Sequence, residues 1–153
     1  AVRHINAAFA KRGWQDRFVT FVAAVLDPAR GELTLVNAGH MAPLLRHRGG
    51  MIEPIGEEEA GLPLGVTDDY PYEASLHKIE AGDSITIFTD GISEAMNAAG
   101  DLYGMERLEK LIGAEQVSVA GLGQHILDDV WQFVDQHPQS DDMCLACFGR
   151  DEG

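Results

Sequence analysis

The fold is decided by the stretch Ser84-Ile85-Thr86-Ile87-Phe88-Thr89-Asp90-Gly91-Ile92-Ser93-Glu94, an apolar segment that runs directly into an acidic one. Its first half is rich in β-branched and aromatic residues, which predicts a strand over residues 84–88. A second acidic cluster, Ser140-Asp141-Asp142-Met143, precedes another apolar segment. Each cluster is therefore expected to hold a carboxylate at the end of a strand.

Carboxylates at strand ends are candidate ligands for a metal ion. Mg²⁺ and Mn²⁺ prefer oxygen ligands, and one or two carboxylates with water often complete their coordination shell. The two clusters are thus candidates for part of a metal-dependent hydrolase site. Asp-Gly is also a common turn dipeptide, so the alternative for Asp90 is an exposed turn residue or a cap for a short helix at residues 92–96.

The composition predicts one globular domain. The chain has 153 residues, of which 45% are hydrophobic and 24% charged, enough for a single domain with its own core. No apolar run approaches the ~20 residues that span a bilayer, and no signal peptide opens the chain, so we expect a cytoplasmic protein without membrane insertion. The formal net charge of −14 argues against nucleic acid as a partner, because a polyanion would be repelled.

The two cysteines, Cys144 and Cys147, lie in an apolar segment that is expected to form a buried strand near residues 143–148. Side chains three positions apart on a strand point to opposite faces, so one metal could not easily be held by both. A structural zinc site needs four ligands, and the sequence has no second cysteine pair. We therefore expect buried free thiols rather than a zinc or redox site.

The order of the predicted elements is typical of an α+β protein. A helical segment at residues 2–10 precedes strands near residues 18–26, 32–37, 42–46, 51–54, 72–79 and 84–88, then helices at 106–112 and 117–134 and a last strand. Hairpins followed by segregated helices define this class. Residues 55–71 are acidic and interrupted by Gly and Pro, which indicates a functional flap or a mobile loop.

Eight short phrases carry a resemblance to a known family. They are Phe18-Val19-Thr20, Leu26-Asp27-Pro28, Asn37-Ala38-Gly39-His40 with Pro43, Leu64-Gly65, Ala81-Gly82-Asp83, Thr89-Asp90-Gly91-Ile92-Ser93-Glu94-Ala95, Tyr103-Gly104 and Ser140-Asp141-Asp142. In this order they resemble the SpoIIE/RsbU branch of the bacterial PP2C-type, metal-dependent serine/threonine phosphatases. The resemblance covers residues 2–150.

The resemblance implies a β-sandwich flanked by helices, in four layers α/β/β/α, with two Mn²⁺ or Mg²⁺ ions at one end. By family analogy Asp90 and Asp141 are metal ligands. Gly91, Asp142, Glu94 and His40 are secondary candidates, as further ligands or as their neighbours. No side-chain nucleophile is implied, because water activated by two ions can attack phosphorus directly.

The sequence departs from the family pattern in one respect. The family carries a further aspartate in a Gly-Asp segment ahead of the first helix, and no such segment occurs here. We therefore expect residues 1–150 to be a phosphatase domain that lacks its N-terminal strands and its first metal-ligand motif.

Several residues also have a structural interpretation. His40, in a Gly-His turn, can serve as a hydrogen-bonding residue, and Asp142 can bond to backbone or solvent because neighbours on a strand point apart. Gly91 can serve backbone geometry. Glu57-Glu58-Glu59 is expected to be a solvated loop, and Trp131-Phe133-Val134 is expected to lie in the core or in an interdomain contact.

The resemblance implies hydrolysis of phosphoserine or phosphothreonine on a regulatory protein of the anti-sigma-factor-antagonist type, with an upstream sensor or receiver domain in the full protein. One alternative is a catalytically impaired phosphatase-like scaffold that binds a signalling partner. Another is a metal-dependent hydrolase that acts on small phosphate esters.

Overall fold

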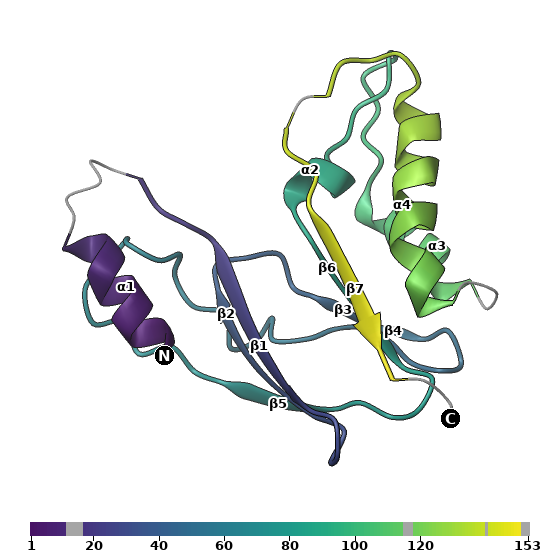
Figure 1. Cartoon of the computed structure of the whole chain (residues 1–153). Helices are drawn as coiled ribbons and strands as arrows, with labels where there is room; N and C mark the ends of the chain where they lie inside the picture. Colours follow the sequence, from purple (N-terminus) through teal and green to yellow (C-terminus); the bar gives the residue numbers. More distant parts are fainter. Residues whose placement is uncertain (12–16, 115–117, 140, 151–153) are drawn as a thin grey trace. The chain divides into compact units, whose positions relative to one another are not determined.

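The computed structural model describes residues 1–11, 17–114, 118–139 and 141–150. The chain divides into two compact units, one made of Ala1–Ala42 with Ile55–Ile79 and the other of Pro43–Pro54 with Glu80–Gly153 (Figure 1). Each unit combines an antiparallel sheet with helix, so the predicted α+β class is confirmed.

The first unit is a three-stranded sheet with one helix packed on it. Its elements are α1 (Val2–Ala10), β1 (Phe21–Asp27), β2 (Glu32–Ala38) and β5 (Ser75–Lys78), and the strand order is β1-β2-β5. The β1–β2 hairpin forms because the Asp27 carboxylate accepts hydrogen bonds from the amides of Ala29 and Arg30, while Gly31 adopts a φ of 62°.

Helix α1 packs on one face of this sheet through side chains at helical spacing. Val2 is buried with Ala38 and Leu64, and Ile5 and Phe9 pack against the same cluster. This spacing is the one from which the helix is predicted.

The irregular segment between β4 and β5 is tied to α1 and β2. The buried Asn6 side chain accepts a hydrogen bond from the Gly65 amide (2.9 Å) and donates one to the Thr67 carbonyl (2.9 Å). The Gly61 amide donates to the Asn37 carbonyl (2.9 Å). These partners for its backbone favour a fixed loop over a mobile one. Of the three glutamates predicted to form a solvated loop, Glu57 and Glu58 are exposed and Glu59 is half-buried.

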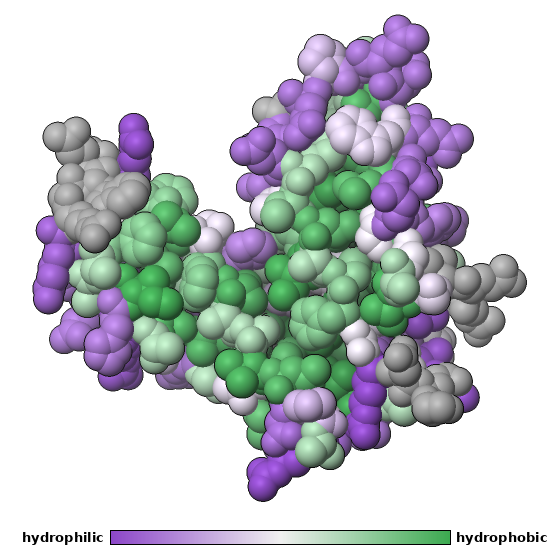
Figure 2. Space-filling model, in the orientation of Figure 1, coloured by the Kyte–Doolittle hydropathy of each residue, from purple (hydrophilic) through white to green (hydrophobic). Residues whose placement is uncertain are grey.

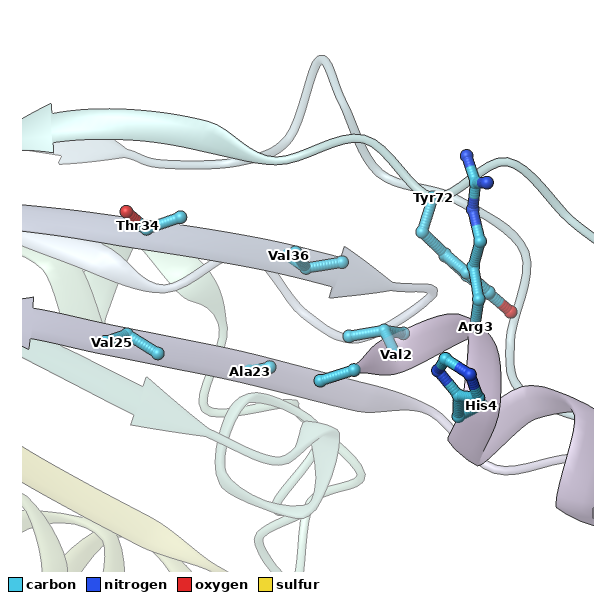
Figure 3. Close-up of a pocket in the computed structure, with 9 residues that line it drawn as sticks. Val2, Arg3, His4, Ala23, Val25, Thr34, Val36 and Tyr72 are labelled. Carbon is cyan, nitrogen blue, oxygen red and sulfur yellow. The ribbon is translucent and has the colours of Figure 1, made fainter.

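Apolar side chains are exposed on the α1 face of the first sheet. Val25 is 70% and Leu76 67% exposed, and Figure 2 shows apolar side chains over these strands. A groove of about 420 Å³ lies between the start of α1 and the sheet, lined by Val2, Val36 and Tyr72 among others (Figure 3). The buried Tyr72 hydroxyl has no hydrogen-bond partner among the described residues, and burial raises the pKa of Tyr72.

The second unit is a four-stranded antiparallel sheet covered by helices. Its strand order is β4 (Ile52–Pro54), β3 (Leu44–Arg46), β6 (Ser84–Phe88) and β7 (Leu145–Gly149). Helix α3 (Met105–Gly113) packs on β3 and β4, and α4 (Val119–Val134) packs on β7. The buried face of α4 is the predicted apolar stripe of Leu122, Ile126, Val130 and Val134.

A polar network joins α3 to α4. Asp129 on α4 accepts hydrogen bonds from the Arg107 guanidinium (2.9 and 3.1 Å) and from the Tyr103 hydroxyl (2.7 Å). The bidentate Arg107 interaction lowers the pKa of Asp129, whereas burial, ahead of the Asp129 hydrogen bond, raises the pKa of Tyr103. The Arg107 guanidinium also lies over the rings of Tyr103 and Phe133. The bidentate hydrogen bonds between Arg107 on α3 and Asp129 on α4 fix the relative position of the two helices.

Asp83 holds the turns at the start of β6. Its side chain is buried, and its two carboxylate oxygens accept hydrogen bonds from the amides of Arg48 (3.0 Å) and Glu80 (2.9 Å). Its backbone carbonyl accepts a further hydrogen bond from the Arg150 amide (3.0 Å). One carboxylate therefore joins the β3–β4 turn to the turn before β6.

The predicted burial of the cysteines is wrong for Cys144. Cys144 is exposed, because β7 begins at Leu145 and the thiol lies in the preceding loop. Cys147 is half-buried on β7, and burial raises the pKa of its thiol. Of the residues predicted to lie in the core or in an interdomain contact, Val134 is buried on the stripe of α4, whereas Trp131 lies off that stripe and is 47% exposed. Trp131 is therefore not a core residue of this unit, and an interdomain contact for it stays a prediction.

Several predicted bounds also shift. β1 begins at Phe21 and β5 at Ser75, later than predicted, and the predicted helix at residues 92–96 is instead α2 (Asp90–Ser93). Strand β3 begins after Pro43, since proline lacks the amide that pairing requires. The predicted start of α4 at residue 117 lies outside the described residues.

We expect Asp83→Ala to lower the free energy of unfolding by about 2–6 kcal/mol, because two amides would lose their buried acceptor at about 1–3 kcal/mol each. Urea unfolding of the variant and of Glu109→Ala, an exposed site on α3, measures the difference. A loss no larger for Asp83→Ala than for Glu109→Ala would contradict this role.

Candidate metal centre

Strands β6 and β7 bring the two acidic clusters to the same end of one sheet. The strands are antiparallel neighbours, and Phe88 at the end of β6 pairs with Leu145 at the start of β7. Asp90 follows β6, and Asp141 and Asp142 precede β7. Residues 89–91, which include the start of α2, and residues 141–144, which precede β7, are therefore adjacent although they are far apart in the sequence. We call these two segments the aspartate loops.

Hydrogen bonds extend the strand pairing into these loops. The Thr89 amide donates to the Cys144 carbonyl (3.0 Å). The Thr89 hydroxyl donates to the Asp142 carbonyl (2.9 Å) and accepts from the Cys144 amide (2.9 Å). The chain that carries Asp90 is thus bonded directly to the chain that carries Asp142.

Gly91 allows the two loops to approach closely. A Cβ atom at this position would lie 2.5 Å from the Asp142 carbonyl oxygen and 2.9 Å from its carbon. No real Cβ contact is that short, so the approach requires glycine. The prediction that Gly91 serves backbone geometry is therefore confirmed: it allows the backbone of Asp142 to approach closely.

The aspartate side chains at this end are exposed and oriented by their own loops. One oxygen of Asp90 accepts a hydrogen bond from the Gly91 amide (3.0 Å), and one oxygen of Asp141 accepts from the Asp142 amide (2.7 Å). Within the described residues, no lysine, arginine or histidine forms an ion pair with Asp90, Asp141 or Asp142. The negative charge at this strand end is not neutralised by those residues.

This donor set fits a hard divalent cation in kind, since it offers uncompensated carboxylate oxygens on adjacent loops. The number of ligands, however, is too small. Among the described residues, no three His, Cys, Asp or Glu side chains are grouped closely enough to hold a metal ion. A complete two-ion site therefore needs more ligands than these residues assemble.

The remaining candidates have other positions. Glu94 is exposed at the C-terminal end of α2. His40 belongs to the first unit, where its Nδ1 atom lies 3.0 Å from the Met41 carbonyl. The buried Asn37 side chain accepts from the His40 amide (2.8 Å) and donates to the His40 carbonyl (3.0 Å). These contacts favour the structural interpretation of His40.

Thr89 is the residue at this site whose role the sequence interpretation missed. Thr89 belongs to the acidic motif that begins Thr89-Asp90-Gly91, but nothing in the sequence indicates which group its hydroxyl bonds to. A threonine before a helix is normally expected to cap that helix. Here the hydroxyl bonds across to the neighbouring loop instead.

Comparison with known proteins identifies the fold as that of PP2C-type phosphatase domains. The chain is similar to the PP2C phosphatase domain and a fragment of the regulatory domain of SpoIIE from Bacillus subtilis, with a TM-score of 0.76 and 18% identity over 96% of this chain and 42% of that one.

The family model described as stage II sporulation protein E (SpoIIE) matches residues 1–151, so the chain belongs to the SpoIIE family. It is 24% identical to protein IcfG of Synechocystis sp. over 98% of this chain and 24% of that protein. It is 28% identical to phosphoserine phosphatase RsbU of Bacillus subtilis over 78% of this chain and 35% of that protein. The chain thus spans about a quarter to a third of the length of these relatives. Among the described residues, no helix has the length and apolar character needed to cross a membrane.

We expect Gly91→Ala to displace the loop that carries Asp141 and Asp142, because the added methyl group would overlap backbone atoms that cannot rotate away. The free energy of unfolding should fall by about 1–3 kcal/mol, in the range for overpacking. Urea unfolding measures this loss. Gly49→Ala is the matched control, since a Cβ there meets nothing within 4 Å. An unchanged stability for Gly91→Ala would contradict the close approach.

Proposed function

We propose that this chain is part of the catalytic domain of a metal-dependent protein serine/threonine phosphatase. The observation that carries the proposal is the placement of Asp90 and Asp141 on hydrogen-bonded loops at the shared end of β6 and β7, in a chain of the SpoIIE family. The similarity to a phosphoserine phosphatase of Bacillus subtilis supports the reaction class.

In this proposal Asp90 and Asp141 hold two Mn²⁺ or Mg²⁺ ions, together with a carboxylate from outside the 153 residues. Bound as a pair, such ions lower the pKa of water and polarise phosphoryl oxygens, which allows hydrolysis without a side-chain nucleophile. Each of these carboxylates accepts a backbone hydrogen bond at one oxygen, and within the described residues its second oxygen is available for a ligand role. Asp142, Gly91 and Glu94 border the same site.

We infer that the substrate is a phosphorylated regulatory protein of the anti-sigma-factor-antagonist type and that an upstream sensor or receiver domain controls the reaction. The support is family membership, with relatives much longer than this chain. The net charge of −14 fits a protein partner better than a nucleic acid.

The second candidate is a phosphatase-like scaffold without catalysis. The observation that favours it is the absence, among the described residues, of three side chains that could hold a metal together. The two functions differ in metal binding, because a scaffold has no need of stoichiometric Mn²⁺.

In the full-length protein, we expect Asp90→Asn and Asp141→Asn each to lower Mn²⁺-dependent kcat/KM for a phosphoprotein by at least about 100-fold, more than the loss of a residue that only orients a ligand. Asparagine keeps the size and the hydrogen bond and removes the charge. Asp128→Asn, at an exposed position of α4, is the control. Near-normal turnover by both variants would rule these aspartates out as ligands.

We expect the 153-residue chain alone to bind Mn²⁺ at least about tenfold more weakly than the full-length protein and to hydrolyse an aryl phosphate slowly or not at all, because both ions need several placed oxygens. Calorimetric titration of the two proteins measures this difference. Tight binding of two ions with full activity would place the missing ligands within residues 1–153, with Asp142, Glu94 and His40 as the first to test.

A further inference from the structure

The Thr89 hydroxyl makes the only side-chain hydrogen bonds that connect the described parts of the two aspartate loops. It donates to the Asp142 carbonyl and accepts from the Cys144 amide, at 2.9 Å each. A hydroxyl has one proton to donate and lone pairs to accept, so a single group satisfies a carbonyl and an amide on the same strand end. The geometry fixes the direction of both bonds, because the amide can only donate.

This use of Thr89 is at odds with its local position. Thr89 is the N-cap of α2, where a threonine hydroxyl ordinarily accepts a hydrogen bond from the first turn of the helix. No side-chain cap bond forms, and the Gly91 amide is satisfied by the Asp90 carboxylate instead. The hydroxyl is thus directed away from its own helix and toward the segment that follows Asp141.

The two neighbours of Asp90 both contact that segment. Thr89 on one side bonds to Asp142 and Cys144, and Gly91 on the other side lies against the Asp142 carbonyl. Asp90 is held between these contacts. We therefore expect loss of the Thr89 side-chain bonds to alter the position of Asp141 and Asp142 relative to Asp90.

We propose that Thr89 is a positioning residue that sets the separation of the Asp90 and Asp141 carboxylates through its hydroxyl, and that metal affinity depends on it. The inference rests on the proposed function, because it assumes that these carboxylates bind the ions. Thr89 touches neither metal nor substrate in this role. It acts by holding the two aspartate loops in a fixed relative position, in the way that residues hydrogen-bonded to metal ligands orient those ligands in metalloproteins.

The experiment measures Mn²⁺ binding to the full-length protein by calorimetry or electron paramagnetic resonance, independently of turnover. Thr89→Val keeps the shape of the side chain and removes the hydroxyl, whereas Thr89→Ser keeps the hydroxyl. We expect Thr89→Val to raise the Kd for Mn²⁺ about 10- to 100-fold and Thr89→Ser to change it less than about threefold, the range for residues that orient metal ligands.

Thr86→Val is the matched control on the same strand. The Thr86 hydroxyl is buried and lies 3.7 Å from the Cys147 sulfur on β7, so the variant makes the same chemical change away from the aspartate loops. We expect its Kd for Mn²⁺ to match that of the wild type. Cooperative thermal unfolding of every variant establishes that each is folded, and amide hydrogen exchange should accelerate at Cys144 in Thr89→Val only.

The outcomes separate the two proposals. Wild-type affinity in Thr89→Val, equal weakening in Thr86→Val, or loss of binding in Thr89→Ser would each overturn the role of Thr89. Absence of Mn²⁺ binding in the wild-type protein would instead overturn the proposed function. In that case unchanged exchange of the Cys144 amide in Thr89→Val would also exclude a loop-positioning role.

Discussion

The antiparallel pairing of β6 with β7 is the interaction on which the candidate site depends. It places Phe88 opposite Leu145 and so joins two acidic loops whose bonded residues, Thr89 and Asp142, are 53 positions apart. Closing a loop of that length carries an entropy cost that local contacts alone cannot offset. The cost is met by the sheet and by α4, which packs its buried stripe against β7. The core of the second unit thereby creates the arrangement of the aspartates.

The strand pair is fixed at both ends by side chains that bond to backbone. At the start of β6, the buried Asp83 carboxylate binds two turn amides, and its carbonyl binds the Arg150 amide next to β7. At the end of β6, the Thr89 hydroxyl binds Asp142 and Cys144. A strand register that slipped by one residue would break both sets of bonds and reverse every side chain. The motifs before and after β6, which contain Asp83 and Thr89, thus both serve to hold the ends of the β6–β7 pair.

The sequence was informative where a signal is local. Periodicity identified α1, β2, β6, α3 and the buried stripe of α4, and the strand-end rule placed Asp90 and Asp141 next to their strands. It failed where the outcome depends on a partner distant in sequence. Cys144 was expected in a buried strand, because an apolar run does not show where pairing begins. Trp131 was expected in the core or in an interdomain contact, and it lies outside the core because it is off the helix stripe. The bonds of Thr89 could not be predicted, because a hydroxyl beside an aspartate selects its partner only after β6 and β7 have paired.

The two aspartate loops are joined by uncharged hydrogen bonds although their side chains carry like charges. Asp90, Asp141 and Asp142 repel one another, and within the described residues no cationic side chain offsets that repulsion. The loops are nevertheless held together by the uncharged hydrogen bonds of Thr89, and Gly91 permits their close approach. Folding therefore supplies the free energy that holds these two segments together. In the proposed function, ions that bind at Asp90 and Asp141 would meet segments already ordered by folding, so less of their binding free energy would be spent on ordering the ligands, which is the general advantage of preorganisation.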